Sequence, residues 1–284
     1  MKSYNPILCL GIFLAAVSVL SAQEVIPNVQ LAVSNPDYPV TVGDIYTLAY
    51  AVNGTMVTYK FMVDSSYTVR ISNLGTINVA GKTYRQLKRD AETIVSNNHP
   101  FSGVQLVLTQ PGIFRVFVTG EVTSAAEITT WSMERLSSLT RLTTPFASVR
   151  NVTVKSADGW VRNYDIFKAE RNGDLSQNPY LRPDDVITFA RLERRVTIRG
   201  AVERPGTYQL LANENLRDLI ETYACGLTPM ADKTRMELLR YMGSTSSFGE
   251  KIALKESNIR GNFILQNYDI VSIPDVSEWW PAIS

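Results

Sequence analysis

Three aspartates in this chain stand at similar turns, each directly before an apolar, strand-forming run. Gly43 precedes the first, Asp44, and the other two, Asp185 and Asp269, each stand four residues after a leucine. A carboxylate in such a turn accepts hydrogen bonds from nearby backbone N–H groups, or it serves in acid–base chemistry. Because the same acid recurs at three spaced positions, we interpret it as a structural turn device and not as one active site.

Other acids and the one histidine offer little further chemistry. Glycoside hydrolysis needs two carboxylates at a fixed separation, and Asp64, Glu121, Asp184 and Asp185 are available, but no spacing in the sequence pairs them. His99 is the only histidine, which excludes sites with two or three histidine ligands. No glycine-rich phosphate loop is present. We therefore predict no enzymatic activity, no metal and no cofactor.

The composition bounds the class of protein. The chain has 284 residues, 28 Lys and Arg against 27 Asp and Glu, and a net charge of +1. This balance argues against a broad basic face for nucleic acid. Hydrophobic residues make up 45% and charged residues 19%, enough to bury cores in about two domains or three small ones.

The first 22 residues have the layout of a secretory signal peptide. Lys2 precedes an apolar run from Ile7 to Leu20, and small and then polar residues follow. The run is shorter than the roughly 20 residues of a membrane-spanning helix, although an uncleaved anchor is the alternative. Cleavage would leave Cys225 as the only thiol, so no internal disulfide is expected.

The next hundred residues contain a hairpin and a helix. Asn53-Gly54 joins two β-rich runs, Tyr46–Val52 and Met56–Val63, and this dipeptide is a strong hairpin signal because both residues tolerate positive φ. Thr83-x-x-Gln86 has the pattern of a capping box that opens a helix. Pro100 disfavours helical geometry before it, so we expect the helix to end there.

The rest of the chain contains an internal repeat. Phe114–Val122 and Arg194–Val202 are similar, and their glycines, Gly120 and Gly200, lie 80 positions apart. Each copy has a strand, this glycine, a second β-rich run and then a helical pattern. Such duplicated blocks are typical of scaffold or binding modules.

The second copy has two features of its own. Pro205-Gly206 forms a turn that the first copy lacks. Asp185 and Asp269 lie 84 positions apart, so the second copy holds four extra residues, which we place around 243–249.

These residues carry a resemblance to a known family. Gly43-Asp44, the hairpin, Leu74-Gly75-x-Ile77-x-Val79-x-Gly81-x-Thr83 and the helix resemble the N-terminal domain of the outer-membrane polysaccharide export family. The repeat resembles the soluble-ligand-binding β-grasp (SLBB) domain, with its clearest phrase at Val196–Tyr208. The resemblance implies an α+β chain with a signal peptide (1–22), an export N-terminal domain (36–110), two SLBB-like domains (111–191 and 192–275) and a C-terminal tail (276–284).

The resemblance also implies a function. We expect a periplasmic, outer-membrane-associated component of a capsular or exopolysaccharide export machine, a homo-oligomeric ring that helps pass the polysaccharide chain. Its expected partners are an inner-membrane polysaccharide co-polymerase and an outer-membrane β-barrel protein. Some family members end in a pore-forming amphipathic helix, but residues 274–284 are too few to span a bilayer. The alternative is a periplasmic ligand- or protein-binding adaptor built from β-grasp modules.

The tail contains one unusual pair, Trp279 and Trp280. Adjacent indoles suit a membrane interface or a partner protein. The alternative is that they pack on their own domain. No polysaccharide contact can be assigned from the sequence.

Overall fold

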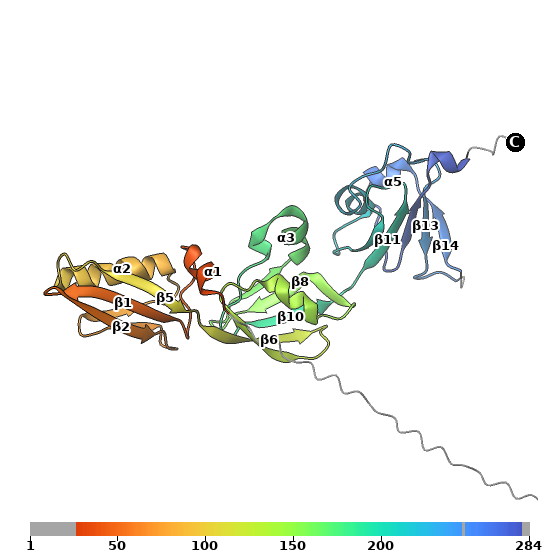
Figure 1. Ribbon diagram of the computed structural model, residues 1–284. Coiled ribbons are helices and arrows are strands. Elements are labelled where there is room, and N and C mark those ends of the chain that lie inside the picture. Colours follow the sequence, from red (N-terminus) through yellow and green to blue (C-terminus); the bar gives the residue numbers. More distant parts are fainter. Residues whose placement is uncertain (1–26, 246–247, 280–284) are drawn as a thin grey trace, which may run out of the picture.

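The computed structural model describes residues 27–245 and 248–279. The predicted signal peptide lies outside this part of the chain. Three units follow one another along the sequence and form an elongated molecule (Figure 1). We call them the N-terminal unit (29–112), the first repeat unit (113–191) and the second repeat unit (195–273). Strands predominate over helices, so the protein is α+β in class.

In the N-terminal unit a helix covers a three-stranded antiparallel sheet of order β2-β1-β5, and a small two-stranded sheet, β3-β4, lies beside it. The elements are α1 (Val29–Ser34), β1 (Ile45–Val52), β2 (Thr55–Met62), β3 (Thr68–Ile71), β4 (Gly75–Asn78), α2 (Tyr84–Asn98) and β5 (Gln105–Gln110).

Both local predictions for this unit are confirmed. Val52 pairs with Thr55 across the Asn53-Gly54 turn, where both residues have positive φ. Thr83 accepts from the Gln86 backbone while the Gln86 side chain accepts from the Thr83 N–H, which completes the capping box. The short helix α1 is not predicted by the sequence pattern, yet its Ala32 is fully buried in the core of this unit.

The two repeat units share one strand order, β7-β6-β10-β8-β9 in the first and β12-β11-β15-β13-β14 in the second. In each, the strand that opens the unit pairs in parallel with the strand that closes it, and the other pairs are antiparallel. The duplication predicted from the sequence is therefore confirmed by the topology.

The first repeat unit contains β6 (Ile113–Gly120), β7 (Ala126–Trp131), η1 (Leu136–Leu142), β8 (Ala147–Lys155), β9 (Val161–Tyr164), α3 (Ile166–Asn172), η2 (Leu175–Gln177) and β10 (Val186–Arg191). The second contains β11 (Arg195–Gly200), β12 (Gly206–Gln209), α4 (Leu216–Asp218), η3 (Leu219–Tyr223), β13 (Glu237–Arg240), β14 (Glu250–Ala253), α5 (Glu256–Arg260) and β15 (Ile270–Ile273), and η4 (Val276–Trp279) follows it.

The predicted position of the extra residues, around 243–249, is confirmed in part. Thr143 bridges to Val122 in the first unit and Leu227 bridges to Val202 in the second. The residues Thr143 and Leu227 are 84 positions apart, so residues are gained before Leu227, in the stretch that holds the π-helical turn η3 (Leu219–Tyr223). Lys155 pairs with Val161 and Arg240 pairs with Glu250, so the hairpin of the second unit also has the longer loop, 241–249 against 156–160. The chain between β14 and β15 is correspondingly shorter than that between β9 and β10.

Each unit buries a hydrophobic cluster, and Trp131 of β7 joins the cluster of the N-terminal unit across the first junction. Separate cores mean that each unit can hold its shape alone, so their relative positions depend on contacts at the two junctions. Within residues 27–245 and 248–279, no helix is long and apolar enough to cross a membrane.

Candidate functional site

The three turn aspartates are buried, with exposed fractions of 0%, 3% and 0% for Asp44, Asp185 and Asp269. Each carboxylate accepts a hydrogen bond from the backbone N–H three residues earlier, at 2.7–2.9 Å. They lie in three different units, so the fold does not bring them together. Their shared geometry is that of a turn device before a buried strand.

Asp44 has the most complete set of donors. Tyr38 and Tyr46 hydroxyls donate to it at 2.7 and 3.0 Å, and the N–H groups of Thr41 and Gly112 donate at 2.9 and 2.7 Å. Burial nevertheless raises the pKa of Asp44 to about 6. The bond to Gly112 ties the start of the N-terminal unit to the segment that leaves it.

Asp269 and Asp185 differ although they occupy equivalent places. Arg240 donates to both oxygens of Asp269, at 3.1 and 2.7 Å. In Asp185, Oδ2 accepts from the Arg182 N–H at 2.9 Å, and Oδ1 is buried without a hydrogen-bond partner. Burial raises the pKa of Asp185 to about 6.

Gly120 and Gly200 are required by close backbone contacts. Their φ angles are +90° and +91°, and a Cβ would lie 2.1 Å from the Phe189 carbonyl oxygen in one unit and 2.0 Å from that of Ile273 in the other. Gly43 has φ +88°, and a Cβ there would lie 3.3 Å from the Gly112 Cα, a looser approach. These glycines shape the units and present no side chain to a ligand.

The Pro205-Gly206 turn leads into β12, and Gly206 pairs with Ile198. The first unit makes the corresponding pair, Val118 with Ala126, at the same spacing. The two hairpins therefore match even though only the second contains the Pro-Gly turn.

The acids considered for glycoside hydrolysis have other contacts. Asp64 accepts from Ser66 at an exposed turn, and Glu121 pairs with Arg191 at 3.1 Å. His99 ends α2 and stacks on Tyr50, with ring centroids 5.8 Å apart. Among the described residues, no group of three or more His, Cys, Asp or Glu could hold a metal ion.

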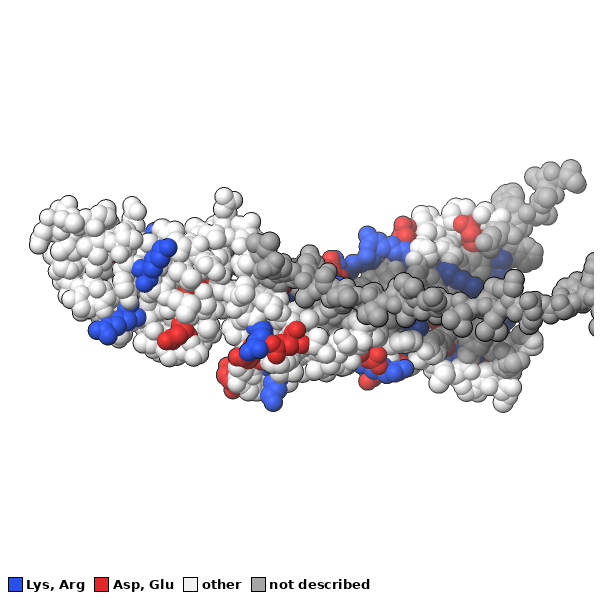
Figure 2. All heavy atoms as spheres, turned by 60° about the horizontal axis from the view of Figure 1, so that its bottom comes forward, with Lys and Arg blue, Asp and Glu red and all other residues white. Residues whose placement is uncertain are grey.

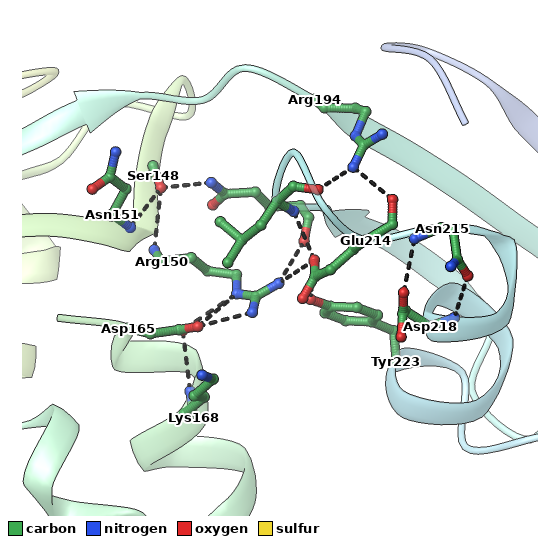
Figure 3. Close-up of polar contacts among 12 residues, drawn as sticks. Ser148, Arg150, Asn151, Asp165, Lys168, Arg194, Glu214, Asn215, Asp218 and Tyr223 are labelled. Atoms are coloured by element: carbon green, nitrogen blue, oxygen red, sulfur yellow. Dashed lines mark hydrogen bonds and ion pairs between the residues drawn. The ribbon is translucent and has the colours of Figure 1, made fainter. Parts of the chain in front are cut away.

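A buried ionic cluster joins the two repeat units (Figure 3). Arg150 on β8 is 6% exposed. Its guanidinium donates to Asp165 of its own unit at 2.8 Å and to Glu214 of the second unit at 2.7 Å. Glu214 also accepts from the Leu211 N–H at 2.6 Å and from the Tyr223 hydroxyl at 2.7 Å. We call these residues the Arg150 cluster.

Aromatic rings close around this cluster. The Arg150 guanidinium lies 5.3 Å from the ring centroid of Phe167 and 5.2 Å from that of Tyr223. These rings come from the two units and lie 5.2 Å apart. Nearby, Gln209 donates to Ser148 across the junction at 2.5 Å. Sequence reasoning missed this cluster because its members look like ordinary surface charges until the units are placed together.

Two adjoining cavities lie at or beside the other junction. One, of about 520 Å³, lies between the N-terminal unit and the first repeat unit. A second, of about 380 Å³, adjoins it, because the two share four lining residues: Ser156, Asp158, Arg182 and Asp185. We call the two together the trough. Both volumes fall in the range of ligand pockets, about 300–1,000 Å³.

The surface charges are mixed in sign. On the face shown in Figure 2, Lys and Arg alternate with Asp and Glu, and no broad patch of one sign is seen. Trp279 is the last residue of η4, whereas Trp280 lies outside the described residues. The predicted docking role of this tryptophan pair therefore stays a prediction.

Comparison with known protein families gives one match. The model of the SLBB domain matches residues 195–251, a stretch that runs from the start of β11 into β14. The second repeat unit is thus similar to SLBB domains, as the sequence indicated, and the first unit shares its strand order.

Proposed function

We propose that this protein is a periplasmic, outer-membrane-associated component of a capsular or exopolysaccharide export machine, where it forms a homo-oligomeric ring scaffold. The observation that carries the proposal is the SLBB match at residues 195–251, on a unit whose strand order occurs twice in the chain. The order of motifs in the N-terminal unit, which resembles the export family, supports it further.

The geometry suits a scaffold. Ring assembly needs subunits with a fixed shape, because a closed ring requires the same angle at every interface. The buried Arg150 cluster fastens the two repeat units to each other, and Asp44 and Gly112 fasten the N-terminal unit to its exit segment. Such a subunit passes a polysaccharide without carrying out chemistry on it. An inner-membrane co-polymerase and an outer-membrane barrel protein are the partners we propose.

The test combines a genetic and a physical measurement. Deleting the gene should abolish surface polysaccharide, and the mature protein should form large closed oligomers by light scattering, in buffer or in mild detergent. A strict monomer at high concentration in both media, together with unchanged surface polysaccharide, would contradict the proposal.

A periplasmic adaptor is the second candidate function, because the SLBB match fits a ligand- or protein-binding module equally well. An adaptor is expected to stay monomeric, to leave surface polysaccharide unchanged on deletion, and to co-purify with one envelope protein. The same two measurements therefore separate the candidates.

A further inference from the structure

The trough lies at a place where the two repeat units differ. In the first unit its floor is the Asp185 turn and its wall is the tip of the β8–β9 hairpin, while segments 37–41 and 80–83 of the N-terminal unit form the opposite side. The second unit has an equivalent turn and an equivalent hairpin, whose loop is longer. A comparison of the two units therefore shows what has changed at this place.

Strand register identifies the exchanged residue. Val186 pairs with Lys155 in the first unit and Ile270 pairs with Leu239 in the second. One step further along, Asp185 faces Ser156, and Asp269 faces Arg240. Arg240 fills the space over Asp269 and bonds both of its oxygens, at 3.1 and 2.7 Å. In the first unit a small serine stands there, and the space remains as part of the trough.

The exchange leaves a carboxylate oxygen without a partner. Asp185 is 3% exposed, and its Oδ1 accepts no hydrogen bond. Buried polar atoms normally find a partner, and an unpaired carboxylate oxygen is costly. Asp185 lines both cavities of the trough, so a donor on a ligand in the trough can approach this carboxyl group.

Rings and charges complete the lining. Trp160 is 64% exposed. The Arg162 guanidinium lies over its indole ring, 5.4 Å from the ring centroid. Tyr67 and Tyr180 lie on the walls. The charged lining residues are three carboxylates and three cations: Asp37, Asp158, Asp185, Lys82, Arg162 and Arg182. This balance favours an uncharged ligand with apolar faces and many hydroxyl groups.

We propose that the trough binds a neutral segment of a glycan chain, with a sugar ring against Trp160 and a hydroxyl donating to Asp185. This inference rests on the proposed export function and assigns a place on the subunit to its cargo. The two adjoining cavities form an extended site, which fits a continuous chain better than a single small molecule. A basic side chain from a neighbouring copy would also pair with Asp185, but the two adjoining cavities are larger than one side chain requires.

The test restores the missing arginine. In Ser156→Arg the new guanidinium should reach Asp185 as Arg240 reaches Asp269 and fill the trough, in exchange for the hydrogen bond from the Ser156 hydroxyl to Asp158. The probes are short oligosaccharides released by mild acid from the surface polysaccharide of the source bacterium, together with an array of neutral bacterial glycans. Binding is measured by calorimetry on the mature full-length protein. We expect Ser156→Arg and Trp160→Ala each to weaken binding about tenfold or more.

Tyr241→Ala is the matched control, because it removes an exposed ring from the corresponding hairpin of the second unit. It should bind as the wild type does. No binding of any probe at millimolar concentration would overturn the proposal, and so would equal affinity of wild type and Ser156→Arg. Loss of the oligomer in Ser156→Arg, without any change in glycan binding, would overturn it in favour of a basic side chain from a neighbouring copy.

Complementation separates this inference from the proposed function. If gene deletion abolishes surface polysaccharide and Ser156→Arg fails to restore it while still assembling, the trough is supported. If Ser156→Arg restores export fully, the trough is wrong and the export function stands. If deletion has no effect on surface polysaccharide, the export function fails, and the calorimetric result alone decides whether the trough binds glycan.

Discussion

At the residue scale, three equivalent turn aspartates, Asp44, Asp185 and Asp269, have different surroundings. The sequence predicts the turn and its bond to a nearby N–H, because both depend on residues within a few positions. It does not predict the remaining partners. Arg240 reaches Asp269 from a strand 29 residues earlier in the chain, and Gly112 reaches Asp44 from 68 residues later. These partners become visible only when strand register is known.

Replacing Arg240 should destabilise the second repeat unit. Arg240→Ser would reproduce the environment of Asp185 and leave Asp269, which is fully buried, without its ionic partner. Removing one member of a buried pair typically costs about 3–5 kcal/mol. Urea unfolding should show this loss. Lys251→Ser removes an exposed cation from the neighbouring strand and should change stability by less than about 1 kcal/mol. Equal effects of the two substitutions would contradict the assignment.

Asp185 should make stability depend on pH. Burial raises its pKa from 3.8 to about 6, so the folded state favours the protonated form. The resulting contribution is full below pH 3.8 and is lost as the pH rises through about 6. Over this window the wild type should lose about 1–3 kcal/mol relative to Asp185→Asn, measured by urea unfolding at several pH values.

The control for this pH series is Glu203→Gln, which changes an exposed carboxylate of the second repeat unit and should follow the wild-type curve. A difference between wild type and Asp185→Asn that does not change with pH would refute the role given to Asp185.

At the element scale, the sequence predicts best where signals are local. The Asn53-Gly54 hairpin and the capping box at Thr83 form as expected. The glycine-containing loop around 243–249 is the usual kind of place for an insertion, and the β13–β14 loop is indeed longer than its counterpart in the first unit. The residues gained before Leu227, near η3, carry no such local signal. Helix α1 was missed because six residues without strong periodicity carry little signal.

Substituting Gly200 tests whether close backbone contacts are the reason that the repeat has a glycine at this position. A Cβ at Gly200 would lie 2.0 Å from a carbonyl oxygen, whereas at Gly159, with the same φ of +91°, it would meet nothing within 4 Å. Gly159→Ala should therefore cost only the penalty of the left-handed backbone, about 1–2 kcal/mol. Gly200→Ala should cost at least 2 kcal/mol more, at the high end of single-substitution effects. Thermal and urea unfolding of both variants measure the difference, and equal losses would remove crowding as the reason for this glycine.

At the scale of the whole molecule, the sequence predicts the number and kind of units but not their junctions. Arg150 and Glu214 are 64 residues apart, in regions that match different parts of the repeat. The Thr41 and Ser132 hydroxyls likewise meet across the first junction, 91 residues apart. Contacts of this kind depend on how complete units pack, and nothing in the spacing of one unit encodes them. The trough, which lies at a junction, was invisible for the same reason.

The Arg150 cluster should make the two repeat units behave as one body. Glu214→Ala removes the acceptor that the second unit offers to Arg150, and a hydrogen bond to a charged group contributes about 1.5–3 kcal/mol. Because Glu214 also has partners within its own unit, a double-mutant cycle with Arg150→Met is needed to isolate the contact between units.

The exposed pair Glu237 and Lys251, 3.6 Å apart, is the control cycle and should give a coupling energy of about 0–1 kcal/mol. We expect a clearly larger coupling for Arg150 and Glu214, together with a broader distribution of molecular dimensions for Glu214→Ala in small-angle X-ray scattering. If the two cycles give the same coupling energy and scattering is unchanged, the units are held by their linker and aromatic contacts alone, and a ring built from them would need its rigidity from neighbouring subunits instead.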